Sequence, residues 1–224
     1  MTVTEMRTVP QAALGVDSTA LYDRYAALYA AFRLHVFPDD RRDIAAALDL
    51  PTAHRIAEIG CGPGFYATAY ARAYPRLRVT GIDRAPAQLA IARGRTHGLT
   101  NVAFVQGDAR MLGRWRGMFD GIIAARLFTV VRDRTRVLAE MRAALAPGGR
   151  LVLAEPLALP RVSVLDLMHS LVPDAAQPAH AAYAAPMREH IFTEAGFAAL
   201  ARSQPWNQLT FWQAHGHRYA CGVK

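Results

Sequence analysis

Three glycines at alternate positions, Gly60, Gly62 and Gly64, directly follow the apolar stretch Ile56–Ile59. Glycine at such positions lets a chain turn sharply from a strand into a helix and approach a ligand more closely than a Cβ would allow. The helix that we expect to begin near Phe65 would direct its free backbone N–H groups at polar or anionic groups of that ligand. The pattern indicates a binding site for a nucleotide-type cofactor.

Further motifs follow this glycine segment in order along the chain. They are Gly81-Ile82-Asp83, Gly107-Asp108-Ala109, Phe119-Asp120 and Leu145-x-Pro147-Gly148-Gly149. Taken with the glycine segment and Glu58, this set over residues 55–155 resembles the class I S-adenosylmethionine-dependent methyltransferases. The segment Phe192–Phe197 resembles the end of that fold more loosely.

This resemblance implies S-adenosylmethionine as the cofactor and S-adenosylhomocysteine as its product. A carboxylate such as Asp83 can accept hydrogen bonds from both ribose hydroxyls. Asp108 can accept from the adenine amino group, with the backbone of Ala109 placed for a ring nitrogen, and the glycine segment would pass the methionine portion. The implied cofactor-binding residues are Glu58, Gly60, Cys61, Gly62, Gly64, Asp83, Arg84, Asp108 and Ala109.

Several of these residues also have a purely structural explanation. Asp83 and Asp108 could cap the helices that follow them, although their joint placement favours binding. Glu58 could anchor the loop, which is compatible with a binding role. Cys61 could be a reactive thiol, but a small polarisable residue in a tight loop is the commoner reason for a cysteine there.

A nicotinamide or flavin oxidoreductase is the nearest competing enzyme class, since a strand, a glycine loop and a later acid are common to both. The dinucleotide fingerprint needs a third glycine where this chain has Phe65, so that the helix can pack closely at a pyrophosphate. The motif Gly107–Ala109 also has no role in that scheme. The sequence therefore favours the methyltransferase interpretation.

Methyl transfer from a sulfonium is an in-line displacement. The protein therefore contributes chiefly alignment and exclusion of water, and a base only where the acceptor must lose a proton. The predicted catalytic candidates are Tyr29, Arg126, His169 and His190. Others that could face the methyl group are Tyr22, Tyr25, Glu155, His180 and Tyr183. For each histidine, an ordinary surface or core role is the alternative.

The string Tyr22–Tyr29 resembles the N-terminal helix of ubiquinone and menaquinone C-methyltransferases and of bacterial phosphatidylethanolamine N-methyltransferases, where it closes over cofactor and substrate. This chain has Ala30 where an aspartate is common. We expect a small organic or lipid-like acceptor. Two alternatives stay open: a phospholipid head-group N-methyltransferase in peripheral contact with an anionic membrane, and a non-catalytic regulatory module that binds S-adenosylmethionine.

Two further features bear on partners and metals. The sequence Ala124–Leu127 lacks the Asn/Asp-Pro-Pro-aromatic motif with which amino-methylating nucleic-acid enzymes hold a flipped base, which argues against a nucleic-acid substrate. His215, His217, Tyr219 and Cys221 would share one face of a late strand and could mimic a metal site. A half-buried terminal strand is the preferred interpretation, and no metal is predicted.

Apolar and turn-forming segments alternate along the chain, which predicts a Rossmann-like, doubly wound α/β fold with a seven-stranded, mostly parallel sheet and helices on both faces. Strands are expected near residues 55–59, 77–82, 101–106, 119–125, 150–155, 197–204 and 215–223. Helices are expected near residues 17–49 with a break at Pro38, and near 65–74, 86–97, 132–145, 163–171 and 188–195.

The chain of 224 residues, 52% of them hydrophobic, is expected to form a single domain. Its predicted parts are N-terminal lid helices (1–50), a cofactor-binding core (51–155), a substrate cap (156–187), and a final helix with two strands (188–224). No segment resembles a signal peptide or a membrane span, and two distant cysteines suit a reducing compartment, so we expect a soluble cytoplasmic protein. The net charge of +8 comes from scattered arginines, which is typical of a solvated surface.

Overall fold

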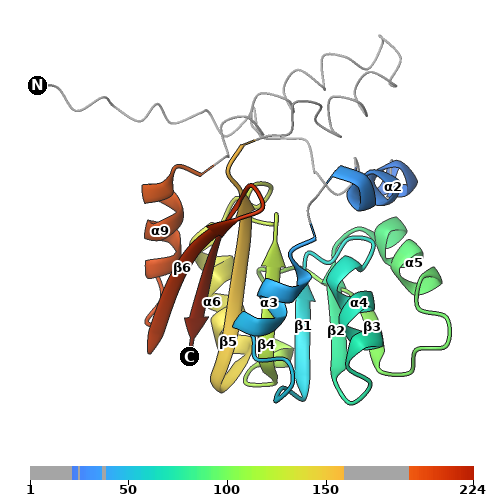
Figure 1. Cartoon of the computed structure of the whole chain (residues 1–224), viewed down its shortest axis with the longest axis horizontal. Coiled ribbons are helices and arrows are strands. Elements are labelled where there is room, and N and C mark those ends of the chain that lie inside the picture. The colour runs from blue at the N-terminus through green and yellow to red at the C-terminus, as the bar shows by residue number, and fades with distance from the viewer. Residues whose placement is uncertain (1–21, 25, 37–38, 159–191) are drawn as a thin grey trace, which may run out of the picture.

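The computed structural model describes residues 22–24, 26–36, 39–158 and 192–224 (Figure 1). Its strands are β1 (Arg55–Ile59), β2 (Arg78–Asp83), β3 (Val102–Gln106), β4 (Phe119–Ala125), β5 (Leu145–Pro156), β6 (Gln208–Ala214) and β7 (His217–Val223). They form one sheet in the order β3-β2-β1-β4-β5-β7-β6. The first five strands pair in parallel, whereas β7 is antiparallel to both of its neighbours. The predicted seven-stranded, mostly parallel sheet is confirmed.

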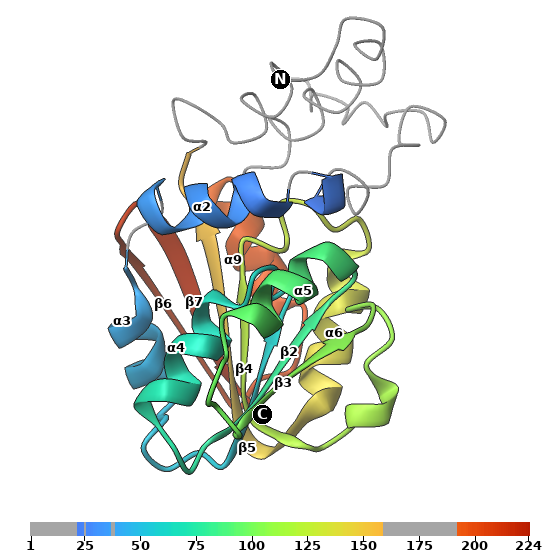
Figure 2. The same cartoon turned by 90° about the vertical axis from the view of Figure 1, so that its right-hand side faces the viewer.

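Helices cover both faces of this sheet, and one, α2 (Ala26–Val36), lies across its carboxyl edge (Figure 2). The others are α3 (Arg41–Ala47), α4 (Phe65–Ala73), α5 (Pro86–Gly94), α6 (Arg134–Ala144) and α9 (Glu194–Arg202), with a short 3₁₀ helix, η2 (Gly113–Trp115). One buried core joins α3, α4 and α5 to the sheet, and a second joins α6 and α9 to the opposite face. The predicted doubly wound arrangement is therefore confirmed (Figure 1).

The central strands are buried on both faces, and β5 shows how its side chains divide between the two cores. Leu151 and Leu153 belong to the core beneath α6 and α9, whereas Val152 and Ala154 belong to the core beneath α3 to α5. Successive side chains of a strand point to opposite faces, so an unbroken apolar run is needed to fill both cores. This is why the strands of this chain appear as continuous apolar segments.

The carboxyl ends of β1 and β4 mark the point where the chain changes direction across the sheet. β1 lies between β2 and β4, so the connections after β1 and β4 leave toward opposite sides. Open α/β sheets bind ligands in the crevice that such a divergence leaves. The motifs that follow β1, β2 and β3, and Arg126 after β4, all lie at this edge.

The prediction for the C-terminal region was wrong at one element. Residues 197–204 were expected to form a strand, but Glu194–Arg202 is the helix α9. The Thr193 hydroxyl accepts a hydrogen bond from the Gly196 N–H at 3.0 Å and caps this helix. Phe197 and Leu200 are buried at a helical spacing, and the strand that follows, β6, begins only at residue 208.

The N-terminal helix lies across the carboxyl edge of the sheet, next to α5 (Figure 2). The Asp23 carboxylate accepts a hydrogen bond from the Ala87 N–H at 2.8 Å, in the first turn of α5. The Gln88 side-chain amide donates to the Tyr22 carbonyl at 3.1 Å, and the rings of Tyr22 and Tyr29 meet edge to face at 5.1 Å. These contacts hold the segment above the predicted cofactor site, and its role as a lid stays a prediction.

Several predictions concern residues outside the described ranges. The helix near 163–171 and most of the cap lie there, as do the first residues of the helix predicted over 17–49. The division of the chain into one domain with these parts stays a prediction. Within the described ranges, no helix has the length and apolar character needed to cross a membrane.

Candidate cofactor and acceptor site

The glycine loop after β1 adopts the left-handed backbone conformation at each of its glycines, with φ values of 69°, 49° and 71° at Gly60, Gly62 and Gly64. A Cβ at Gly60 would lie 2.8 Å from Leu127 Cδ1, and one at Gly64 would lie 2.7 Å from Phe104 Cζ. Gly60 and Gly64 are thus required by packing within the protein as well as by the turn. Gly62 has more room, since its nearest neighbour would be Tyr29 Cε1 at 3.7 Å.

Glu58 and Cys61 support this loop. The buried Glu58 carboxylate accepts a hydrogen bond from the Ala67 N–H at 2.7 Å and so ties β1 to the first turn of α4. Burial raises the pKa of the Cys61 thiol well above its usual range, and its Sγ lies 3.7 Å from the Gly62 carbonyl oxygen. The geometry therefore favours the loop-anchor interpretation of Glu58 and argues against a reactive thiolate at Cys61.

Asp83 joins the loop after β2 to the glycine loop. One carboxylate oxygen accepts from the Gly62 N–H at 2.7 Å, and the other accepts from the Ala85 N–H at 2.9 Å. Burial raises the pKa of this carboxyl, and backbone hydrogen bonds from Ala85, Gly62 and Arg84 oppose that shift. A carboxylate has about four acceptor sites, so capacity for a ribose diol is left beside these two bonds. Its role in cofactor binding stays a prediction.

Asp108 is engaged differently. Both of its carboxylate oxygens accept hydrogen bonds from the Arg110 side chain, at 2.6 to 3.1 Å, and Arg84 Nε lies 3.7 Å away. The bonds from Arg110 hold the pKa of the Asp108 carboxyl below its usual value. An adenine amino group at Asp108 would compete with Arg110 for these oxygens. Sequence reasoning missed Arg110, although its position two residues after Asp108 was the available signal.

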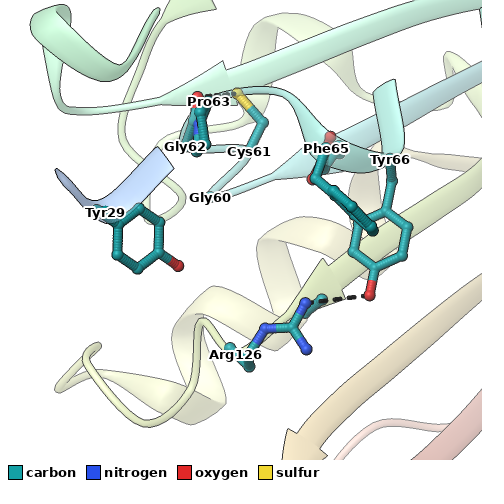
Figure 3. Close-up of a pocket in the computed structure, with 10 residues that line it drawn as sticks. Tyr29, Gly60, Cys61, Gly62, Pro63, Phe65, Tyr66 and Arg126 are labelled. Atoms are coloured by element: carbon teal, nitrogen blue, oxygen red, sulfur yellow. Dashed lines mark hydrogen bonds between the residues drawn. The ribbon is translucent and has the colours of Figure 1, made fainter. Parts of the chain in front are cut away.

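A pocket opens between the glycine loop and the end of β4 (Figure 3). It is lined by Tyr29, Glu58, Gly60, Cys61, Gly62, Pro63, Phe65, Tyr66, Ala125 and Arg126. Of the predicted catalytic residues, Tyr29 from α2 and Arg126 after β4 are brought together here. Tyr66 was missed at the sequence level, because nothing in its local pattern distinguishes it from a core aromatic residue.

Arg126 is held by a network that reaches α3 and β7. Its Nη2 donates to the Tyr66 hydroxyl at 3.1 Å, and its Nη1 lies 3.0 Å from His217 Nε2. The Tyr66 hydroxyl donates to Asp40 at 2.7 Å, and the Tyr219 hydroxyl donates to the other oxygen of Asp40 at 2.9 Å. Asp40 is only 1% exposed. Sequence reasoning missed it, since the chain separates it widely from each partner.

Glu155 lies behind the connection that follows β4. It is 0% exposed, and its Oε1 accepts from the Phe128 N–H at 2.8 Å. Its Oε2 has no hydrogen-bond partner among the described residues, and burial raises the pKa of the carboxyl to about 8. The suggestion that Glu155 could face the methyl group does not fit this burial. Its carboxyl supports the loop after Arg126.

The late histidine and cysteine cluster has structural contacts. His215 Nε2 lies 3.0 Å from Asp43 Oδ2, and the Cys221 thiol lies 3.6 Å from the Ala47 carbonyl oxygen. Both partners belong to α3. In the part of the chain that the structure describes, no three His, Cys, Asp or Glu side chains are grouped as metal ligands. The side chains of this strand attach α3 to the sheet.

The remaining candidates cannot be placed. His169, His190, His180 and Tyr183, as well as Tyr25, lie outside the described residues. Their suggested roles near the methyl group stay predictions.

Comparison with known proteins gives a match over the cofactor core. Residues 56–149 match the family described as a methyltransferase domain. The chain is 38% identical over 128 residues to demethylmenaquinone methyltransferase from Thermus thermophilus, covering 55% of this chain and 58% of that protein. It is 33% identical over 115 residues to trans-aconitate 2-methyltransferase from Variovorax paradoxus, covering 51% of this chain and 43% of that protein. It thus spans about half the length of these relatives.

Solved structures extend the likeness to nearly the whole chain. A SAM-dependent methyltransferase from Aquifex aeolicus aligns with a TM-score of 0.66 at 15% identity, over 93% of this chain and 98% of that one. Phosphoethanolamine N-methyltransferase 2 from Haemonchus contortus, in complex with S-adenosyl-L-methionine, aligns with a TM-score of 0.68 at 14% identity, over 94% and 60%. At these identities the likeness concerns the fold. Residues 56–149 thus form a methyltransferase domain, and the fold of the chain is the fold of S-adenosylmethionine-dependent methyltransferases.

Proposed function

We propose that this chain transfers a methyl group from S-adenosylmethionine to a small organic or lipid-like acceptor by in-line displacement. The observation that carries the proposal is the meeting of the motifs after β1, β2 and β3 at one edge, beside a pocket that Tyr29 and Arg126 also line. The cofactor supplies an electrophilic methyl group on its sulfonium. The side chains would bind, orient and exclude water.

Each cofactor residue has a proposed role at this edge. Asp83 would hold the ribose diol with its remaining acceptor sites. Asp108 would accept from the adenine amino group once Arg110 gives way, with Arg84 at the rim and the Ala109 backbone at the ring. The main chain of Gly60–Gly62 would pass the methionine portion.

The acceptor side is proposed from the pocket and from the relatives. Tyr29 and Arg126 would contact the acceptor or the methionine portion, and His169 or His190 would act as a base if the acceptor loses a proton. The names of the relatives refer to demethylmenaquinone and to trans-aconitate. A quinone-type ring and a small carboxylic acid are therefore the first acceptors to test. These names do not favour the head-group or the non-catalytic alternative.

Isothermal titration with S-adenosylhomocysteine tests the cofactor site. Loss of the two ribose bonds to a carboxylate, each about 1.5 kcal/mol or more, predicts that Asp83→Ala weakens binding by roughly 100-fold. Asp39→Ala, which removes an exposed carboxylate paired with Arg41, is the matched control and should bind as the wild type does.

Two results would count against the proposal. Failure of the wild type to bind S-adenosylhomocysteine would remove its basis, and so would an Asp83→Ala variant of unchanged affinity. With binding established, mass spectrometry of reactions that contain demethylmenaquinone or trans-aconitate would report a methylated product.

A further inference from the structure

Arg126 occupies an unusual backbone conformation at the pocket. Its φ of 56° lies in the left-handed region, which residues other than glycine seldom adopt. Its N–H donates to the Ala154 carbonyl at 2.7 Å, and its carbonyl accepts from the Thr129 hydroxyl at 3.2 Å. Strained residues of this kind persist where the surroundings fix them, often at ligand sites. The main chain therefore holds this side chain at the pocket rather than leaving it to solvent.

Side-chain contacts then fix the orientation of the guanidinium. His217 Nδ1 lies 2.9 Å from the His215 carbonyl and must donate to it, so the neutral ring presents Nε2 as an acceptor to Arg126 Nη1. Tyr66 donates its hydroxyl hydrogen to Asp40 and can accept from Arg126 Nη2 with a lone pair. Figure 3 shows the guanidinium across the pocket from the glycine loop. The group is oriented in advance of any ligand.

The charges that line this pocket match a particular ligand chemistry. Arg126 and Glu58 are both among the residues that line it. A planar guanidinium binds carboxylates through parallel N–H bonds, which gives geometric selectivity that a lysine lacks. One cation and one carboxylate on the same pocket also suit the zwitterionic end of an amino acid.

We propose that Arg126 binds a carboxylate in this pocket, with Tyr66, His217 and Asp40 as its positioning residues. The carboxylate comes either from the methionine end of the bound cofactor or from an acidic acceptor. This inference rests on the proposed function for both sources, and it assigns to Arg126 a binding role that the fold alone does not require.

Isothermal titration with three probes distinguishes the sources. The probes are S-adenosylhomocysteine, 5′-methylthioadenosine, which lacks the amino-acid end, and citrate added to the protein saturated with S-adenosylhomocysteine. The variants are Arg126→Gln and Arg126→Lys, with Arg55→Gln as a control on an exposed arginine at the opposite end of β1.

A cofactor carboxylate predicts that Arg126→Gln weakens S-adenosylhomocysteine about 30-fold and leaves 5′-methylthioadenosine unchanged. Arg126→Lys should lose less affinity for S-adenosylhomocysteine, because it keeps the charge. Tyr66→Phe should also lose less affinity for S-adenosylhomocysteine and none for 5′-methylthioadenosine. If Arg126 instead binds the carboxylate of an acceptor, Arg126→Gln should keep the wild-type affinity for S-adenosylhomocysteine. Citrate should then bind to the wild type and not to Arg126→Gln.

Binding of 5′-methylthioadenosine reports that each variant is folded, and if Arg126→Gln fails this test the comparison is made with Arg126→Lys. Equal S-adenosylhomocysteine affinity in all variants, together with citrate binding that is absent or equal, would overturn the inference while leaving the proposed function intact. If the wild type binds neither nucleoside, the proposed function fails. If citrate then binds to the unloaded wild type and not to Arg126→Gln, the carboxylate site at Arg126 is still supported. If citrate does not bind, both the proposed function and the carboxylate site are overturned.

Discussion

The two halves of the carboxyl edge are built in different ways, and the half formed by β1, β2 and β3 depends on contacts that are local in sequence. Glu58 bonds to the N–H of Ala67, 9 residues later, and Asp108 bonds to Arg110, 2 residues later. Asp83 accepts from Ala85, also 2 residues later, in addition to its bond to the glycine loop. The polar groups of this half are set mainly by the turns in which they stand.

The half formed by β4, β5 and β7 depends on contacts between distant segments. Arg126 meets His217, 91 residues later, and Tyr66, 60 residues earlier. Tyr219 meets Asp40 across 179 residues. After the roles proposed for them, we call the first the cofactor half and the second the acceptor half. Short motifs can encode the cofactor half, whereas the acceptor half exists only once the whole sheet and α3 have assembled.

Removing the centre of the long-range network should have the largest effect on stability. Asp40→Ala leaves two buried tyrosine hydroxyls without their acceptor, so we expect a loss of about 3 kcal/mol in the free energy of unfolding, measured by urea denaturation. Tyr219→Phe removes one of these bonds and should cost about 1 kcal/mol. Asp39→Ala, next in sequence but exposed, should stay within about 0.5 kcal/mol of the wild type. Equal losses at Asp39 and Asp40 would contradict the comparison.

Glu155 gives the acceptor half a pH dependence that extends to about pH 8. Its folded pKa of about 8 lies above its ordinary value, so the folded state binds more protons than the unfolded state between these two values. The stability that this group contributes is full below its ordinary pKa and is lost as pH rises through about 8.

Glu155→Gln keeps an oxygen for the Phe128 N–H and has no proton to lose. We expect thermal unfolding of the variant to change less between pH 5 and pH 9 than that of the wild type, with a gain of roughly 2 kcal/mol at the upper end. If the stabilities of the wild type and Glu155→Gln change in parallel between pH 5 and pH 9, Glu155 is not the cause of the pH dependence.

The smallest effect is expected at the local pair in the cofactor half. Arg110→Ala releases the Asp108 carboxylate for the adenine amino group. The variant should bind S-adenosylhomocysteine about 3-fold more tightly by isothermal titration, since a partly exposed ion pair is worth little. Arg114→Ala, on the nearby η2 helix, serves as the control. Weaker binding by Arg110→Ala would instead mean that Arg110 holds Asp108 in its binding orientation.

Much of the fold could be predicted because its signals are local. The strands over 55–59 and 119–125 were predicted with the bounds that the structure has, since each is a short apolar run between turn residues. The strand predicted over 197–204 was wrong because Phe197 and Leu200 suit either element, and the cap at Thr193 decides for the helix.

The sequence by itself determined the mostly parallel sheet, the glycine turn and the acids at the strand ends, because each follows from the alternation of apolar and turn-forming segments or from the conformational freedom of glycine. Only the tertiary structure decided that Glu155 is enclosed and that Asp40 and His217 orient the Arg126 guanidinium. These features depend on which distant side chains meet after burial. No local pattern encodes such meetings, since each partner alone is an ordinary polar residue.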